Sequence, residues 1–192
     1  MPIPPEAREN FNRRCVALTS KLSDPDFLQN RGLGNEVGIY TFCYDPSLEL
    51  ETRHFLRCLA QDDSLPCRLV EHNLYRIALE RLESRNLLDR MDPMEKKHGR
   101  AWIIRQMNKI CPSSLYAQEI SSTPREPGDV VLITGIGEVY PFLRLHDLLE
   151  NIQPLVRDVP IVAAYPGRFD GKTLQLFSRL EDENYYRAFD LV

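Results

Sequence analysis

A glycine loop directly after the most apolar run of the sequence is the first place where the residue types could do chemistry. Val130–Ile133 is short and largely β-branched, and residues 134–138 read TGIGE. Backbone N–H groups in such a loop, at the start of a helix, bind phosphate groups well. A Walker loop, however, requires Lys and then Ser or Thr after its last glycine, and a dinucleotide loop requires a third glycine three positions after Gly137, where Tyr140 stands. The carboxylate of Glu138 would also repel phosphate, so a tight turn that aims the next helix is preferred over nucleotide binding.

The strongest polar cluster, Arg144, His146 and Asp147, follows this loop, and a histidine there could act as a general acid or base. No nucleophile accompanies it, and residues two apart on a helix do not share a face. The four histidines are scattered, and none has a second metal ligand at a binding spacing. Hydrolase elbows, HExxH zinc motifs and EF-hand loops are missing as well. We therefore expect no enzyme activity, no metal and no cofactor.

Asp45-Pro46 has two interpretations. Aspartate is a strong helix N-cap and proline suits the first helical position, so the pair predicts the start of a helix. Ligands of open α/β sheets, however, collect beyond the carboxyl ends of the strands, where Asp45 would lie beside the Gly135 loop. The cap is preferred, and a shared crevice is the alternative.

Charge and composition exclude some functions. The 192 residues are 43% hydrophobic and 27% charged, which is ordinary for a globular protein, and the net charge of -4 gives no overall nucleic-acid footprint. The most basic segment holds Lys96, Lys97, His98, Arg100, Arg105 and Lys109. A solvated helix face is the preferred interpretation of this segment, and nucleic-acid contact is the alternative.

Cysteine use and hydropathy indicate the compartment. The five cysteines are odd in number and contain no Cys-x-x-Cys pair, so reduced, core-packed thiols are expected. The segment MPIPPEAREN lacks the apolar core of a signal peptide, and no stretch approaches the roughly 18 apolar residues needed to cross a bilayer. We expect a cytoplasmic protein without membrane contact.

The periodicity of apolar residues predicts a single domain over residues 1–192, an α/β fold of three layers with a mainly parallel central sheet between helices. Helices are expected over 5–22, as a short piece capped by Asp24, from Asp45 to about 62, and after the cap residue Asn73. One longer helix is expected from Asp92 to Ile110, and one over 139–152. Strands are expected over 37–44, 67–71, 130–133 (central) and 159–165. Residues 173–180 and 185–192 alternate as strand residues do and predict a closing antiparallel hairpin, although a helical turn also fits Leu174, Phe177 and Leu180.

Several uncommon strings carry a family resemblance. The segments GLGNEVGIYTFCYDP (32–46), residues 129–154, residues 159–180 and ENYYRAF (183–189) resemble the BrxB family, a component of bacterial BREX phage-defence systems. The likeness runs from about residue 11 to residue 189. The family positions that can be placed are Gly34, Asn35, Asp45, Gly135, Gly137, Tyr140, Pro141, Gly167, Asp170, Gly171, Asn184, Tyr185, Tyr186 and Arg187. No catalytic residues are carried over with them.

The resemblance implies an accessory protein encoded beside a phosphatase-like PglZ protein, a methyltransferase, a large ATPase and the BrxA protein. We therefore expect a non-enzymatic adaptor that binds other BREX subunits, PglZ first among them, with homodimer formation, nucleotide binding and nucleic-acid binding as alternatives. The candidate binding residues are Asn35, Asp45, Gly135, Gly137, Glu138, Tyr140, Arg144, Asp170, Tyr185, Tyr186 and Arg187.

Overall fold

A mainly parallel sheet organises the chain. The computed structural model describes residues 5–31, 38–170, 173–181 and 189–191. The strands are β1 (Ile39–Tyr44), β2 (Leu69–Asn73), β3 (Val130–Thr134), β4 (Ile161–Phe169), β5 (Leu174–Leu176), β6 (Leu180–Glu181) and β7 (Phe189–Asp190). The order β2-β3-β4-β1-β7 is parallel throughout. The predicted α/β fold with a central parallel strand at 130–133 is confirmed.

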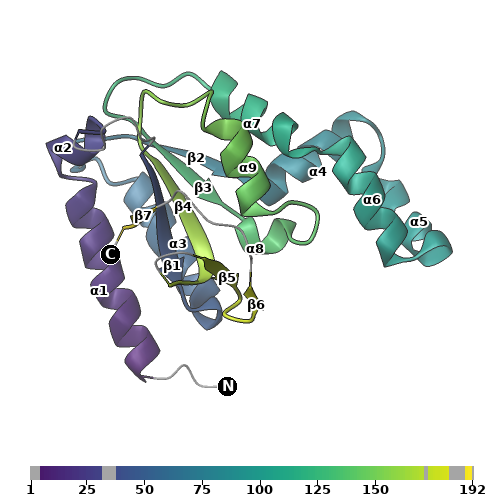
Figure 1. The fold of residues 1–192 in the computed structure, drawn as a ribbon, viewed down its shortest axis with the longest axis horizontal. Helices are drawn as coiled ribbons and strands as arrows, with labels where there is room; N and C mark the ends of the chain where they lie inside the picture. Colours follow the sequence, from purple (N-terminus) through teal and green to yellow (C-terminus); the bar gives the residue numbers. More distant parts are fainter. Residues whose placement is uncertain (1–4, 32–37, 171–172, 182–188, 192) are drawn as a thin grey trace.

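Helices cover both faces of this sheet (Figure 1). One layer holds α1 (Pro5–Lys21), α2 (Pro25–Leu28), the 3-10 turn η1 (Pro46–Leu48) and α3 (Glu49–Ala60); the other holds α4 (Leu74–Ser84), α6 (Arg100–Ile110), α7 (Ser113–Ser122), α8 (Ile136–Val139) and α9 (Leu145–Ile152). Because successive strand residues point to opposite faces, Val130 and Leu132 pack in the first layer's core and Val131 and Ile133 in the second's.

Three side-chain caps start helices where the sequence predicts them. The Asp24 carboxylate accepts a hydrogen bond from the Asp26 N–H at 3.0 Å, and the Asp45 carboxylate accepts one from the Ser47 N–H at 2.8 Å. The side-chain amide oxygen Oδ1 of Asn73 accepts one from the Arg76 N–H at 2.9 Å. Each cap satisfies a backbone donor that the first helical turn leaves unpaired, which contributes about 1 kcal/mol.

Two helices that we predicted as continuous are interrupted, so those predictions are wrong. The segment from Asp92 to Ile110 is divided between α5 (Met91–His98), which follows the turn η2 (Leu88–Arg90), and α6. The break is at Gly99, whose φ of 80° no α-helix accommodates. The segment 139–152 is divided between α8 and α9. Pro141 lies in the break, and its ring removes a donor and clashes with the preceding turn.

The C-terminal strands pair differently from the predicted hairpin. β4 does not end at Tyr165 but continues to Phe169, where it pairs antiparallel with β5, and β5 pairs with β6. β7 instead joins the sheet parallel to β1. Gly167 allows the close approach of β4 and β5, because a Cβ there would lie 2.1 Å from the backbone oxygen of Gln175. Antiparallel pairing is present, but among the described residues β5 pairs with β4 and β6, and β7 pairs with β1, so the partners differ from those predicted.

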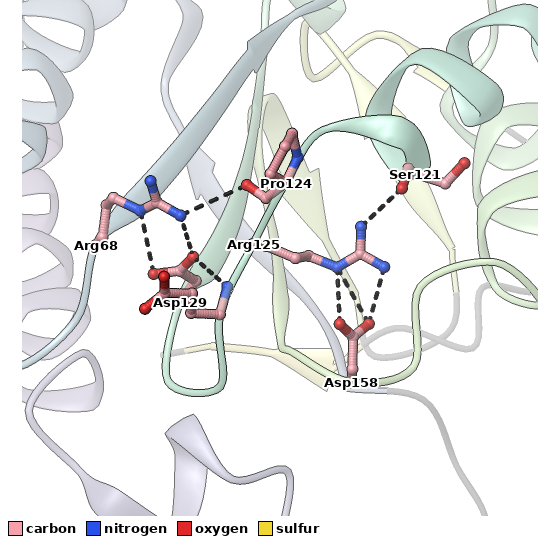
Figure 2. A network of polar contacts seen from close by, with 7 residues as sticks. Arg68, Ser121, Pro124, Arg125, Asp129 and Asp158 are labelled. Atoms are coloured by element: carbon pink, nitrogen blue, oxygen red, sulfur yellow. Dashed lines mark hydrogen bonds and ion pairs between the residues drawn. The ribbon is translucent and has the colours of Figure 1, made fainter.

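The amino edge of the sheet is closed by two arginine–carboxylate pairs (Figure 2). Arg68, before β2, donates through Nε and Nη2 to the two oxygens of Asp129, before β3, at 3.2 and 2.5 Å. Arg125 likewise donates hydrogen bonds to the carboxylate of Asp158, before β4, at 2.9 to 3.1 Å. It also donates one to the Ser121 carbonyl oxygen at 3.0 Å. These forks fasten the α7–β3 connection to the starts of three strands.

Candidate functional site

An open cleft of about 460 Å³ lies at the opposite, carboxyl edge of the sheet. Its floor is formed by residues of the parallel strands, and its walls are formed by α3 from Glu49 to Arg57, by the first half of α4 and by α8. The polar and aromatic side chains that line it include Tyr44, Glu49, Arg53, Arg57, Tyr75 and Glu138. It separates α3, in one helical layer, from α4 and α8, in the other, and this is the crevice in which open α/β sheets bind ligands.

Arg53 is the central cation of the cleft. Its Nε lies 2.8 Å from Oε1 of Glu49, one turn earlier on α3, and its Nη2 lies 2.9 Å from Oε2 of Glu138 on α8. These two carboxylates raise the pKa of the Arg53 guanidinium further. The ion pairs link the two helical layers across the sheet edge and leave Arg53 electrically neutralised.

Neighbouring hydroxyl groups hold two of the cleft's carboxylates in place. The Tyr44 hydroxyl donates to Oε2 of Glu49 at 2.6 Å, and the Thr134 hydroxyl donates to Oε1 of Glu71 at 2.7 Å. Burial, and then the hydrogen bond to Glu49, raise the pKa of Tyr44 far above its ordinary value, so Tyr44 remains a proton donor at any physiological pH.

The two glycines of the predicted loop have separate structural roles. Gly135 has a φ of 75°, and a Cβ there would lie 2.8 Å from the Asn73 oxygen that caps α4. Gly137 lies against Pro166 and Phe177, where a Cβ would come within 2.9 and 3.0 Å of their rings. The loop is therefore a close-packed turn that aims α8, which is the preferred interpretation of its sequence.

Of the predicted site residues, the structure brings Gly135 and Glu138 together in the cleft. Asp45 lies in a separate groove between α1 and the end of β4. Because β4 lies between β1 and β3 in the sheet, Asp45 at the end of β1 does not share a crevice with Gly135 at the end of β3. Tyr140 packs its ring edge-on against Phe177, with centroids 6.4 Å apart.

The remaining predicted residues lie elsewhere. Arg144 is exposed at the start of α9, beside a depression between α6, α7 and α9. Asp170 closes a turn by accepting hydrogen bonds from the Thr173 N–H and hydroxyl at 2.7 and 2.9 Å. Asn35, Tyr185, Tyr186 and Arg187 lie outside the described residues.

Sequence reasoning missed the cleft residues that come from α3 and α4. Glu49, Arg53 and Arg57 follow one another at one-turn intervals on α3. This i, i+4 spacing predicts a charged face of the helix, but it does not predict which part of the protein that face contacts. Tyr75 follows the Asn73 cap and is 37% exposed at the rim. Only the strand order brings these side chains to Glu138, 85 positions beyond Arg53 in the chain.

Within residues 5–31, 38–170, 173–181 and 189–191 no cluster of three metal-ligating side chains occurs. His146 is near Asp147 and Glu150, at 3.7 and 3.6 Å, on the surface of α9 rather than in the cleft. No helix of the described chain is long and apolar enough to cross a membrane. Cys43 and Cys111 are buried as expected, whereas Cys58 is exposed.

Fold and cleft together define a mainly parallel α/β domain with an open, charge-balanced cleft at the carboxyl ends of its strands. The family model described as "BREX protein BrxB" matches residues 70–191. The BREX protein BrxB of Bacillus cereus (strain H3081.97) is 38% identical over 190 residues, covering 95% of this chain and 97% of the relative. That of Escherichia coli O9:H4 (strain HS) is 30% identical over 187 residues, covering 93% and 90%. No solved structure matches. The chain belongs to the BrxB family, a component of BREX phage-defence systems.

Proposed function

We propose that this protein is a non-enzymatic adaptor of a BREX phage-defence system and that it binds another BREX subunit, with PglZ as the first candidate, through the carboxyl-edge cleft. The observation that carries the proposal is the residue content of the cleft. Its rim offers Tyr75 and Arg57, and tyrosine and arginine are the types that dominate binding energy at protein interfaces. Arg57 has no ion pair within the described chain, so it is available to a partner's carboxylate.

The charge balance of the cleft also favours a polypeptide over a phosphate ligand. Three carboxylates, Glu49, Glu71 and Glu138, line the cleft together with three guanidinium groups, Arg53, Arg57 and Arg76. A phosphate beside Gly135 would meet the carboxylate of Glu138, whose nearest cation already serves two acids. A protein surface, by contrast, can present both signs of charge at once.

Co-purification tests this proposal. The tagged chain is expressed with PglZ and the other subunits of its operon, and complexes are resolved by size-exclusion with light scattering. We expect a complex of defined stoichiometry with the wild type. Arg57→Glu/Tyr75→Ala should weaken it by at least about 10-fold, because truncating a well-packed anchor typically costs about 2 kcal/mol or more.

Arg13→Glu/Leu155→Ala is the matched control, because Arg13 and Leu155 are exposed outside the cleft and the charge change is the same. Undiminished binding by the cleft variant would place the contact outside the cleft, and equal loss in both variants would make the effect one of total charge; either result would overturn the assignment of the contact to the cleft. The other surface named by the sequence is tested by changing Tyr185, Tyr186 and Arg187 together to Ala. If no BREX subunit co-elutes with the wild type, the adaptor proposal is wrong.

The size of the cleft keeps small-molecule binding as a second candidate, since ligand pockets typically measure about 300 to 1,000 Å³. Calorimetry with ATP and GTP tests it directly. If millimolar nucleotide gives no heat of binding and no shift in melting temperature, small-molecule binding is wrong. A heat of binding or a shift that Arg53→Met abolishes would support it.

A further inference from the structure

The segment Arg85–Ile110, which we call the basic arm, has a charge opposite to that of the rest of the chain. It contains seven Lys or Arg and three Asp or Glu, a net charge of +4 in a protein whose total is -4. From Lys96 to Gln118 the chain carries five Lys or Arg and no acidic residue. Such a local concentration of cations is the electrostatic footprint of an anion-binding surface.

The basic arm also stands away from the sheet. In Figure 1 α5 and α6 extend to the right, at the opposite side of the molecule from α1. α6 is fastened through its apolar face, where Ile103 and Met107 are buried in the core. α5 is held to α6 by the stacked rings of His98 and Trp102, with centroids 4.6 Å apart, while residues 92–100 are all exposed. The outer surface of the arm is therefore presented to solvent on a folded support.

The outer face of α6 carries cations without internal partners. Arg105 and Lys109 are one turn apart, about 6 Å along the axis, with Asn108 beside them, and all three are exposed. Within the described chain neither Arg105 nor Lys109 forms an ion pair, and the same holds for Lys97 on α5. Lys96 and Arg100, by contrast, pair with Asp92 at 2.6 Å and Glu95 at 3.4 Å. Three cations thus remain for an external anion.

We infer that the basic arm binds the phosphodiester backbone of nucleic acid without sequence preference, a function separate from partner binding in the cleft. The side chains on the outer face of α6, arginine, asparagine and lysine, are those that contact DNA phosphates and sugars. A protein interface would instead be depleted in lysine and built on apolar or aromatic residues at its centre. The outer face of α6 has no exposed large apolar or aromatic residue of this kind. Met94, which is 36% exposed, is on α5.

Fluorescence anisotropy with a labelled 30-base-pair duplex, titrated with the full chain from 50 to 200 mM NaCl, tests the inference. We expect a Kd on the order of 10 µM at 50 mM salt, in the range of non-specific binding, and a log–log salt slope of about -3 for three neutralised phosphates. Arg105→Glu/Lys109→Glu should weaken binding at least about 10-fold and remove about 2 from the slope. The same strand as single-stranded DNA and as RNA shows which form the backbone contact prefers.

Arg13→Glu/Lys21→Glu, on α1, makes the same change of net charge and should leave the Kd within about 3-fold, because screening at 0.1 M salt confines charge effects to about 10 Å. Arg105→Ala/Lys109→Ala, which keeps good helix formers, should lose affinity in the same direction. Equal loss in the control would make the effect one of total charge and would overturn the inference. So would undiminished binding by the α6 variants, or no binding of any of the three nucleic acids at 50 mM salt. Loss of a BREX subunit from the α6 variants, without nucleic-acid binding by the wild type, would assign the arm to protein contact instead.

Discussion

At the amino edge of the sheet, Asp129 is 8% exposed and both of its oxygens are held by one guanidinium, while at the carboxyl edge the two carboxylates that hold Arg53 are each about one-third exposed. Both edges therefore use arginine–carboxylate pairs, but in different surroundings. The amino-edge pairs connect strand starts and a loop. The carboxyl-edge pairs line an open cleft. Burial of the Asp129 carboxylate therefore favours a contribution of its ion pair to stability, whereas the partly exposed carboxylates around Arg53 contribute less to folding.

The comparison predicts its largest effect for Asp129→Ala. This change removes the two bonds from Arg68 and the 2.8 Å hydrogen bond from the Glu126 N–H, so we expect a loss of about 2 to 3 kcal/mol in urea denaturation. Asp63→Ala, at an exposed position, should stay within about 0.5 kcal/mol. The hydrogen bonds from Arg68 lower the pKa of Asp129, so its stabilisation is present above about pH 4 and is lost as the pH falls through that lowered pKa. A difference between wild type and variant that did not shrink in acid would contradict this assignment.

A smaller effect is expected for Gly135→Ala at the carboxyl edge. Both the positive φ and the contact with the Asn73 cap oppose a Cβ, and we expect a cost of about 2 kcal/mol. Gly99→Ala is the matched control, because Gly99 has a φ of 80° but no atom within 4 Å of the position that a Cβ would take. Thermal denaturation of the two variants separates backbone strain from the steric contact. Equal losses would show that Asn73 moves aside freely.

Arg53→Met should change stability by less than about 1 kcal/mol, since partly exposed ion pairs contribute little to folding. It leaves Glu49 and Glu138 without their common cation, so the same variant should weaken binding of a partner in the cleft. The measurement is urea denaturation together with the co-purification assay. A stability loss as large as that of Asp129→Ala would remove the distinction between the two edges.

The smallest predicted effect concerns pH and His72, at the end of the edge strand β2. Burial, and then the charges of Arg125 and Arg76 opposed by Glu71, lower the pKa of His72, and its Nε2 has no hydrogen-bond partner within the described chain. The unfolded chain therefore binds a proton more readily, so stability is full above about pH 6.5 and falls below it. His72→Gln should show a flatter decline between pH 7.5 and 5.5 in thermal melts. An unchanged slope would mean that the pKa of His72 is the same in the folded and the unfolded chain and would contradict the assignment.

Local features of the fold could be predicted from the sequence, and those that depend on distant contacts could not. The Asp24, Asp45 and Asn73 caps follow from residue type and position, because a cap and its donor lie within three residues. The apolar periodicity across Gly99 and Pro141 continues through both breaks, so it predicts one helix where backbone geometry makes two.

The site was harder to predict than the fold. Gly135 and Glu138 were identified from the turn chemistry of one loop. Arg53 and Arg57 were not, because an i, i+4 charge pattern on a helix is equally typical of a solvated face. The alternative that Asp45 shares a crevice with the Gly135 loop is wrong, because β4 lies between β1 and β3, and the sequence does not reveal this strand order.

That strand order also constrains how the chain can be assembled during translation. β1 pairs on one side with β4, which begins about 120 residues later, and on the other with β7, later still. Neither flank of β1 can be hydrogen-bonded before the ribosome has made Ile161–Phe169, and closing so long a loop costs entropy that only the finished sheet repays. In the finished fold Phe42 of β1 packs against Phe11 of α1 and Phe55 of α3, and both helices are synthesised long before β4. We therefore expect that these helices can cover this side chain while the sheet is still incomplete.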